Sequence, residues 1–241
     1  MPTISISENG VKYFWYWKPE SRFPPPAVLR PDDFAVTDRL NVACTQTGLP
    51  AREERTILNS WCEALPTLTG VRFLWFSSRV SQGLFEAACQ MADLEGLYIK
   101  WSSIADLSSI GRSQSIRYFH LGPSPHVASI VPLGNCRQLR WLGLELLSQI
   151  TDLEPVGRLV DLEGLALEGS MGTTWRVETL APVGHLLGLR YLSIANLRST
   201  DESLSGLLSL HHLVAFRHAT WWDALELAEI RRRNSGLAPS A

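Results

Sequence analysis

The stretch of sequence that decides the fold is residues 150–167, ITDLEPVGRLVDLEGLAL. It ends in three leucines with the spacing L-x-x-L-x-L, at Leu162, Leu165 and Leu167. Apolar residues also stand three, six and nine positions before the first of these leucines, at Leu159, Val156 and Leu153. Because alternate residues of a strand point to one side and a period of three suits a tight helical or extended arm, this stretch predicts a short strand preceded by a short return arm.

The same template recurs seven times along the chain. The first apolar residues of the copies are spaced by 23, 22, 23, 23, 27 and 24 residues, and they are Val71, Leu94, Ile116, Leu139, Leu162, Leu189 and Leu213. Proline recurs seven residues before three of them, as Pro132, Pro155 and Pro182. This self-similarity predicts stacked coils, each with room for a 3₁₀ or extended return arm but little room for a long helix.

Residues 150–162 resemble the I-x-D-L-x-P-L-x-x-L-x-x-L segment of internalin-like and phosphatase-1-regulator-like leucine-rich repeats, and TLAPVGHLLGL at 179–189 repeats the resemblance. The similarity covers about residues 65–218. It implies an α/β solenoid, a leucine-rich-repeat horseshoe of about seven coils with parallel strands on the concave face and short 3₁₀ or extended return arms. It implies little about a partner, because one fold serves many functions.

The asparagine that this family usually places three residues after the third apolar position is missing here. Its amide would bond neighbouring backbone, and the residues in its place are Arg79, Ser102, Ser124, Leu147, Ser170, Leu197 and Trp221. Serine hydroxyls can satisfy some of those backbone groups, whereas leucine and tryptophan cannot replace the full ladder. The sequence therefore indicates a divergent subclass.

The two ends of the solenoid need caps, because stacked repeats expose an apolar core at each end. Residues 1–64 are expected to form the N-terminal cap, with a β-hairpin around Asn9-Gly10, a proline-rich connector and a helix from Pro50 to about Leu65. Residues 65–220 hold the leucine-rich repeats. Residues 221–241 are expected to form a capping helix from Asp223 to about Arg233 and a frayed tail.

Composition narrows the class of partner and the location. The net charge of −2 gives no general field for nucleic acid or an anionic membrane, so neither is expected to bind. No apolar run approaches the roughly 18 residues of a membrane helix. The four cysteines form no C-x-x-C pair, so a zinc site is not expected. The first residues lack a secretory pattern, which together with the cysteines favours a cytoplasmic protein.

Most candidate binding residues lie between the apolar positions of each strand, because strand side chains alternate between the core and the concave face. The others follow the third apolar position by one or two residues. We predict that they contact a partner protein, since tyrosine and tryptophan are favoured interface anchors. Those of the first four coils are Phe73, Trp75, Tyr98, Lys100, Trp101, Tyr118, His120 and Trp141, and the later ones are Glu145, Glu168 and Tyr191. The alternative is that the N-terminal hairpin, with Tyr13, Trp15, Tyr16 and Trp17, folds over them.

Two further features come from the repeat. The long fifth coil carries extra residues at 169–176, and Trp175 in this insertion is predicted either to contact a partner or to fold back on its neighbour coil. The residues after each first apolar position alternate in charge, which predicts lateral ion pairs within the sets Arg72, Glu95, Arg117 and Arg140, Glu163, Arg190.

No catalytic constellation is found in the sequence. There is no glycine-rich phosphate loop, no H-E-x-x-H and no G-x-S-x-G, so we predict a non-enzymatic protein that needs no cofactor and no small-molecule substrate. The leading interpretation is a protein-binding module. Its alternatives are an immunity protein or inhibitor that neutralises a toxin or enzyme, and a regulatory subunit of an enzyme such as a phosphatase. The least favoured alternative is an enzyme with its site in residues 1–64.

Overall fold

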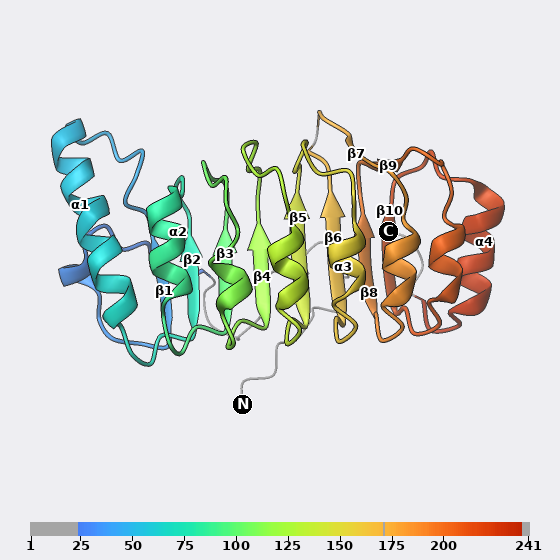
Figure 1. Cartoon of the computed structure of the whole chain (residues 1–241), viewed down its shortest axis with the longest axis horizontal. Helices are drawn as coiled ribbons and strands as arrows, with labels where there is room; N and C mark the ends of the chain where they lie inside the picture. The colour runs from blue at the N-terminus through green and yellow to red at the C-terminus, as the bar shows by residue number, and fades with distance from the viewer. Residues whose placement is uncertain (1–23, 171, 238–241) are drawn as a thin grey trace.

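Eight parallel strands form one continuous sheet in the computed structural model, which describes residues 24–170 and 172–237. The strand order β1-β2-β3-β4-β5-β6-β8-β10 almost follows the chain (Figure 1). The strands are β1 (Arg39–Val42), β2 (Phe73–Phe76), β3 (Gly96–Ile99), β4 (Tyr118–Leu121), β5 (Trp141–Glu145), β6 (Gly164–Glu168), β8 (Tyr191–Ile194) and β10 (Ala215–His218). The leucine-rich-repeat solenoid predicted from the sequence is therefore confirmed.

The return arms pack in a row on one face of the sheet, in front of the strands in Figure 1. The first two arms are helices, α1 (Ala51–Ala64) and α2 (Gln82–Cys89). The later arms are the short turns η4 (Ile110–Arg112), η5 (Val131–Asn135), α3 (Glu154–Gly157), η6 (Ala181–His185) and η7 (Ser205–Ser209). The recurring prolines stand in the first turn of η5, α3 and η6, where a missing N–H leaves no hydrogen bond unmade.

The main core lies between the sheet and these arms. All six apolar residues of the 150–167 stretch that define the template are buried with at most 1% exposure. The register is the one that the repeat predicts, since Leu142, Leu165 and Leu192 of three neighbouring strands are aligned partners. Burial of the arm residues explains the period of three, because each arm turns one apolar row toward the strands.

Strand β1 was not predicted, although it pairs in register with β2. Leu40 and Val42 align with Leu74 and Phe76, but Thr37 stands where the template needs its first apolar residue. Because that position is polar, the strand does not match the L-x-x-L-x-L pattern. The helix expected at 50–65 is confirmed as α1, and it follows β1 as the arm of the first coil.

Serines replace part of the missing asparagine ladder, as expected. The hydroxyls of buried Ser102 and Ser124 lie 2.6 Å apart, Ser124 donates to the carbonyl of Gly122, and the Ile104 amide donates to Ser102. At the other positions Leu147 and Leu197 are fully buried in the core instead. This exchange of amides for apolar packing distinguishes these coils from the usual family pattern.

Close packing of the arms depends on glycine at two clear positions. A Cβ on Gly184 of η6 would lie 2.0 Å from the carbonyl oxygen of Gly206 in the next arm. A Cβ on Gly157 of α3 would lie 2.8 Å from the carbonyl oxygen of Pro182. Since real Cβ atoms do not approach backbone so closely, these glycines allow consecutive arms to pack backbone to backbone.

The C-terminal end of the sheet is covered by α4 (Ala224–Arg233), as predicted. Asp223 caps this helix by accepting hydrogen bonds from the amides of Leu225 and Glu226. Ile230 of this helix is buried in the main core, whereas Leu225 is 81% exposed. Polar contacts also hold the helix, since Glu226 accepts hydrogen bonds from the Ser203 hydroxyl and the Leu204 amide.

Three smaller elements complete the described chain. They are η2 (Pro31–Asp33), η3 (Leu65–Thr67) and a second, two-stranded parallel sheet of β7 (Trp175–Val177) and β9 (Leu197–Ser199). The predicted N-terminal hairpin and the final tail residues lie outside the described residues, and the boundaries at 64/65 and 220/221 stay predictions. No helix among the described residues is both long and apolar enough to cross a membrane.

Candidate functional site

The outward face of the sheet, opposite the arms, carries two columns of aligned side chains. The first column runs Arg39, Phe73, Gly96, Tyr118, Trp141, Gly164, Tyr191 and Ala215. The second runs Asn41, Trp75, Tyr98, His120, Gly143, Ala166, Ser193 and Arg217. The parallel register therefore brings most of the sequence-predicted residues onto one surface.

Seven rings on this surface form an aromatic layer, which we define as Phe73, Trp75, Tyr98, Tyr118, His120, Trp141 and Tyr191. The rings of Phe73 and Tyr118 contact across Gly96, with centroids 6.4 Å apart. Trp141 and Tyr191 stack across the next glycine, Gly164, with centroids 5.3 Å apart. Glycine between the aromatic residues leaves space for rings two strands apart to meet.

Gly96 must be small for the first of these contacts. A Cβ on this residue would lie 2.7 Å from an edge carbon of the Phe73 ring. The layer is thus a second apolar cluster, separate from the leucine core on the other face of the same strands.

Burial divides the aromatic layer into two kinds of residue. Phe73, Trp75, His120 and Trp141 are at most 5% exposed, whereas Tyr98, Tyr118 and Tyr191 are half-buried. The first half of the concave face is therefore largely closed to solvent. A free docking surface would be an open aromatic patch instead.

Two acidic residues follow the aromatic layer at the C-terminal ends of β5 and β6. Glu145 and Glu168 are aligned partners on adjacent strands. Burial, and secondarily the charge of Glu168, raises the pKa of the Glu145 carboxyl to about 7. The Nε2 atom of His120 lies 3.4 Å from Glu145 Oε1, but burial lowers the pKa of His120 to about 3. The imidazole is neutral near pH 7, so this contact is not an ion pair.

Glu168 is held by two neighbours. The Ser193 hydroxyl donates to Glu168 Oε1, and Arg217 Nη1 donates to the same oxygen over 3.1 Å. Arg217 is about half exposed and comes from β10, two strands beyond β6 in the sheet. Glu168 and Arg217 therefore add a charged pair to the far half of the concave face, where Ala166, Ser193 and Ala215 are buried.

Lys100 and Trp101 lie in the loop that follows β3. The Lys100 ammonium nitrogen is 4.6 Å from the centre of the Trp101 ring, and the Trp101 indole donates to Gln46 Oε1 over 3.0 Å. Gln46 belongs to the loop after β1, where its backbone has a φ of 59°. Sequence reasoning missed Gln46 because it missed β1, the strand that places this loop beside the repeat.

Trp175 is not on the concave face. It is 1% exposed in the main core, and its indole donates to the carbonyl of Ile150 over 2.8 Å. The extra residues of the fifth coil thus lead into β7, which pairs with β9. Of the two predictions made for Trp175, this placement agrees with folding back on a neighbouring coil.

The predicted lateral ion pairs form in part. Arg72 makes a two-pronged contact with Glu95, with nitrogen–oxygen distances of 2.7 and 2.9 Å. Arg140 instead turns to Asp161, donating to its backbone carbonyl over 3.1 Å and lying 4.0 Å from its carboxylate. The alternating charges in the sequence predicted the pair of Arg72 and Glu95. They did not predict that Arg140 would contact Asp161 at a coil junction.

The side chains of the concave face carry groups that suit recognition. No group of three His, Cys, Asp or Glu side chains among the described residues is placed to hold a metal ion. The least favoured alternative is an enzyme site in residues 1–64. Within that segment, residues 39–64 form β1, α1 and the loop between them. The rings, the carboxylates and Arg217 offer stacking, apolar contact and charge pairing.

The chain has a leucine-rich-repeat fold, and solved internalin structures share this fold. It is similar to internalin C2 of Listeria monocytogenes, with a TM-score of 0.54 and 23% identity over 73% of this chain and 71% of that one. It is also similar to the internalin inlF of the same organism, with a TM-score of 0.53 and 18% identity over 72% of this chain. This second match spans 54% of inlF. No family model and no curated protein sequence matches the chain.

Proposed function

We propose that this protein is a non-catalytic interaction module that binds another protein through its concave face. The observation that carries the proposal is the aromatic layer, because the same strands already bury a complete leucine core on their other face. Folding of the coils does not need a second apolar surface. Large aromatic side chains gathered outside the core are the usual anchors of protein interfaces.

The first contacts with a partner are assigned to the members of the face that solvent reaches. These are Lys100, Trp101, Tyr98, Tyr118, Glu145, Glu168, Tyr191 and Arg217. The buried rings Phe73, Trp75, His120 and Trp141 lie beside these residues and support them. Trp175 is left out of the proposed surface, because its ring lies in the main core.

The test uses the whole chain as bait and compares two faces of the solenoid. A partner captured from the source cells is identified by mass spectrometry, and its affinity is then measured for purified variants. Trp101→Ala with Tyr191→Ala should weaken binding at least tenfold, in the range of interface anchors. The matched control is Val160→Ser with Leu187→Ser, two exposed apolar residues at coil junctions away from the strands. Equal affinity of both double variants contradicts the proposal.

A further inference from the structure

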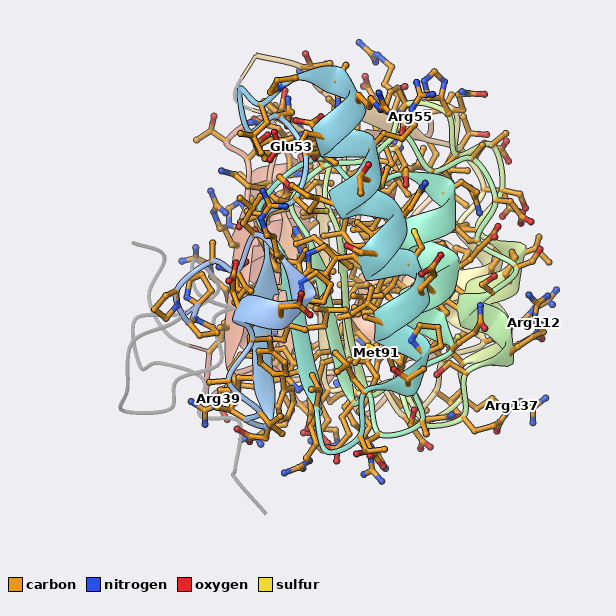
Figure 2. All side chains as sticks on the ribbon, turned by 90° about the vertical axis from the view of Figure 1, so that its left-hand side faces the viewer. Arg39, Glu53, Arg55, Met91, Arg112 and Arg137 are labelled. Atoms are coloured by element: carbon orange, nitrogen blue, oxygen red, sulfur yellow. The ribbon has the colours of Figure 1, made fainter. Side chains whose placement is uncertain are left out.

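Pro25, near the start of the described residues, lies on the concave side of the solenoid. The side chain of Asn41, in the outward column of β1, donates to the carbonyl of Pro25 over 2.9 Å. Val28 then pairs with Val42 at the edge of β1, and the carbonyl of Leu29 accepts from the Trp61 indole of α1. Residues 25–29 therefore cross from the concave face to the helix face, and Pro25 is at the concave end of this crossing. In Figure 2 the labelled Arg39 marks that side, away from the helices.

The aromatic layer starts on the strand next to this crossing. Phe73 and Trp75 of β2, at 2% and 5% exposure, are the nearest rings, and Trp141 of β5 is the farthest of the nearly buried ones. Three strand spacings separate β2 from β5, about 14 Å. Whatever shields these outward-pointing rings from solvent must span that width and present an apolar surface of its own.

The chain supplies a segment with that composition and reach. Residues 11–17, VKYFWYW, contain five aromatic side chains in seven positions. The seven residues 18–24 that join them to Pro25 can span at most about 24 Å. This exceeds the distance of about 19 Å across the four strand spacings from β1 to β5. The tether is thus long enough for the segment to reach every nearly buried ring of the layer.

We propose that residues 11–17 dock on the aromatic layer within the same molecule. The segment is then an internal occupant of the concave face over strands β2 to β5. A consequence, which rests on the proposed function, is competition: a partner that needs the aromatic rings must displace the segment, and its apparent affinity falls by the fraction of molecules in which the layer is free.

The experiment measures how fast diethyl pyrocarbonate modifies individual histidines in the full-length protein. His120 reports on the aromatic layer, and the exposed His211 and His212 report on the intact surface elsewhere. In the wild type, His120 should react slowest. Trp15→Ser with Trp17→Ser should accelerate its modification at least tenfold and leave His211 unchanged. Trp221→Ser, an exposed tryptophan at the other end, is the control and should leave His120 protected.

Two additional experiments test the same proposal. A synthetic peptide of residues 8–20 added to the double variant should protect His120 again, while the same peptide with serine at both tryptophans should not. In the wild type, nuclear Overhauser contacts should join rings of residues 13–17 to Tyr98 or His120, which settles the matter if the double variant does not fold. His120 that stays protected in a folded double variant overturns the proposal. So does protection that weakens on dilution, because the occupant would then be a second copy of the chain. Neither experiment involves a partner protein. The proposed function can therefore fail or hold independently of the docking of residues 11–17.

Discussion

The imidazole of His120 stacks on the ring of Tyr98, with the ring centroids 4.4 Å apart and the planes within 6° of parallel. The stack keeps the imidazole buried on the face of the sheet that does not carry the leucine core. Burial penalises the charged form of the ring, so the pKa of His120 falls to about 3. Its neighbour Glu145 shifts in the opposite direction, to a pKa of about 7. Two adjacent groups are therefore both favoured in their neutral forms.

These shifts predict a pH dependence with two opposing parts. A folded-state pKa raised above the ordinary value means that folded Glu145 holds a proton that the unfolded chain has lost, so its contribution to stability decreases between about pH 4.5 and 7. The lowered pKa of His120 has the opposite sign: stability increases with pH between about 3 and 6.5. The two effects offset each other where the windows overlap, and the free energy of unfolding should vary little there.

Glu145→Gln separates the two parts. The variant should be more stable than the wild type at pH 8, and the difference should vanish below about pH 4.5. Because the Glu145 side chain is 39% exposed, solvent screening reduces the expected gain to about 1 kcal/mol. Urea unfolding of both proteins from pH 4 to 8 measures it. A difference that is constant over this range means that Glu145 does not titrate with a raised pKa.

The leucine spacing predicted the sheet because each apolar position has one geometric role. A residue that must be buried in every coil leaves the same mark in every copy, and the aligned triplet Leu142, Leu165 and Leu192 shows the register that results. The outward columns follow from the same alternation. Recognition of one strand therefore located the candidate surface on all the repeated strands.

Other features left no repeated mark in the sequence. Strand β1 has polar Thr37 at the first template position, so its pairing with β2 depends on tertiary packing rather than pattern. Trp175 has the composition of an interface residue, but the pairing of β7 with β9 carries it into the core. The near-complete burial of Trp75 and Trp141 does not follow from alternation, which gives the face that a side chain is on and not its exposure.

The packing of the return arms predicts a large effect of a single methyl group. Gly184→Ala would place its Cβ 2.0 Å from the Gly206 carbonyl oxygen, so the backbone of one arm must move. We expect a loss of about 2–3 kcal/mol in the free energy of unfolding, as for overpacked cores. Gly188→Ala is the control, since its Cβ would meet no atom closer than 3.9 Å. Denaturant unfolding checks both, and equal stability of the two variants would show that the arms separate easily.

Asn234 is expected to be a strong point of attachment for the C-terminal cap. It is buried, its side-chain oxygen accepts from the Leu213 amide, and its nitrogen donates to the carbonyls of Leu210 and Ile230. Asn234→Ala leaves these backbone groups buried without partners and should cost about 2–4 kcal/mol. Relative to the wild type, the Asn234→Ala variant should show a larger increase in hydrogen exchange at β10 than at β2. The exposed Asn59→Ala serves as the reference, and a variant as stable as this reference would contradict the role.

The two lateral ion pairs differ in geometry and should differ in energy. Arg72 and Glu95 contact each other through two hydrogen bonds, and each side chain is 28% exposed. Arg140 and Asp161 lie 4.0 Å apart with side chains 40% and 57% exposed. A planar, two-pronged and partly shielded pair loses less to solvent and to side-chain entropy than a single loose contact does.

Double-mutant cycles to alanine give the two coupling energies. We expect about 1 kcal/mol for Arg72 with Glu95, close to the upper range of exposed pairs, and a value near zero for Arg140 with Asp161. Raising the salt concentration should reduce the first coupling energy, because Debye screening weakens charges that water still reaches. Since the first pair joins the coils that begin with β2 and β3, its loss should also accelerate hydrogen exchange in β2. If both cycles give the same coupling energy, geometry does not decide the strength of these pairs.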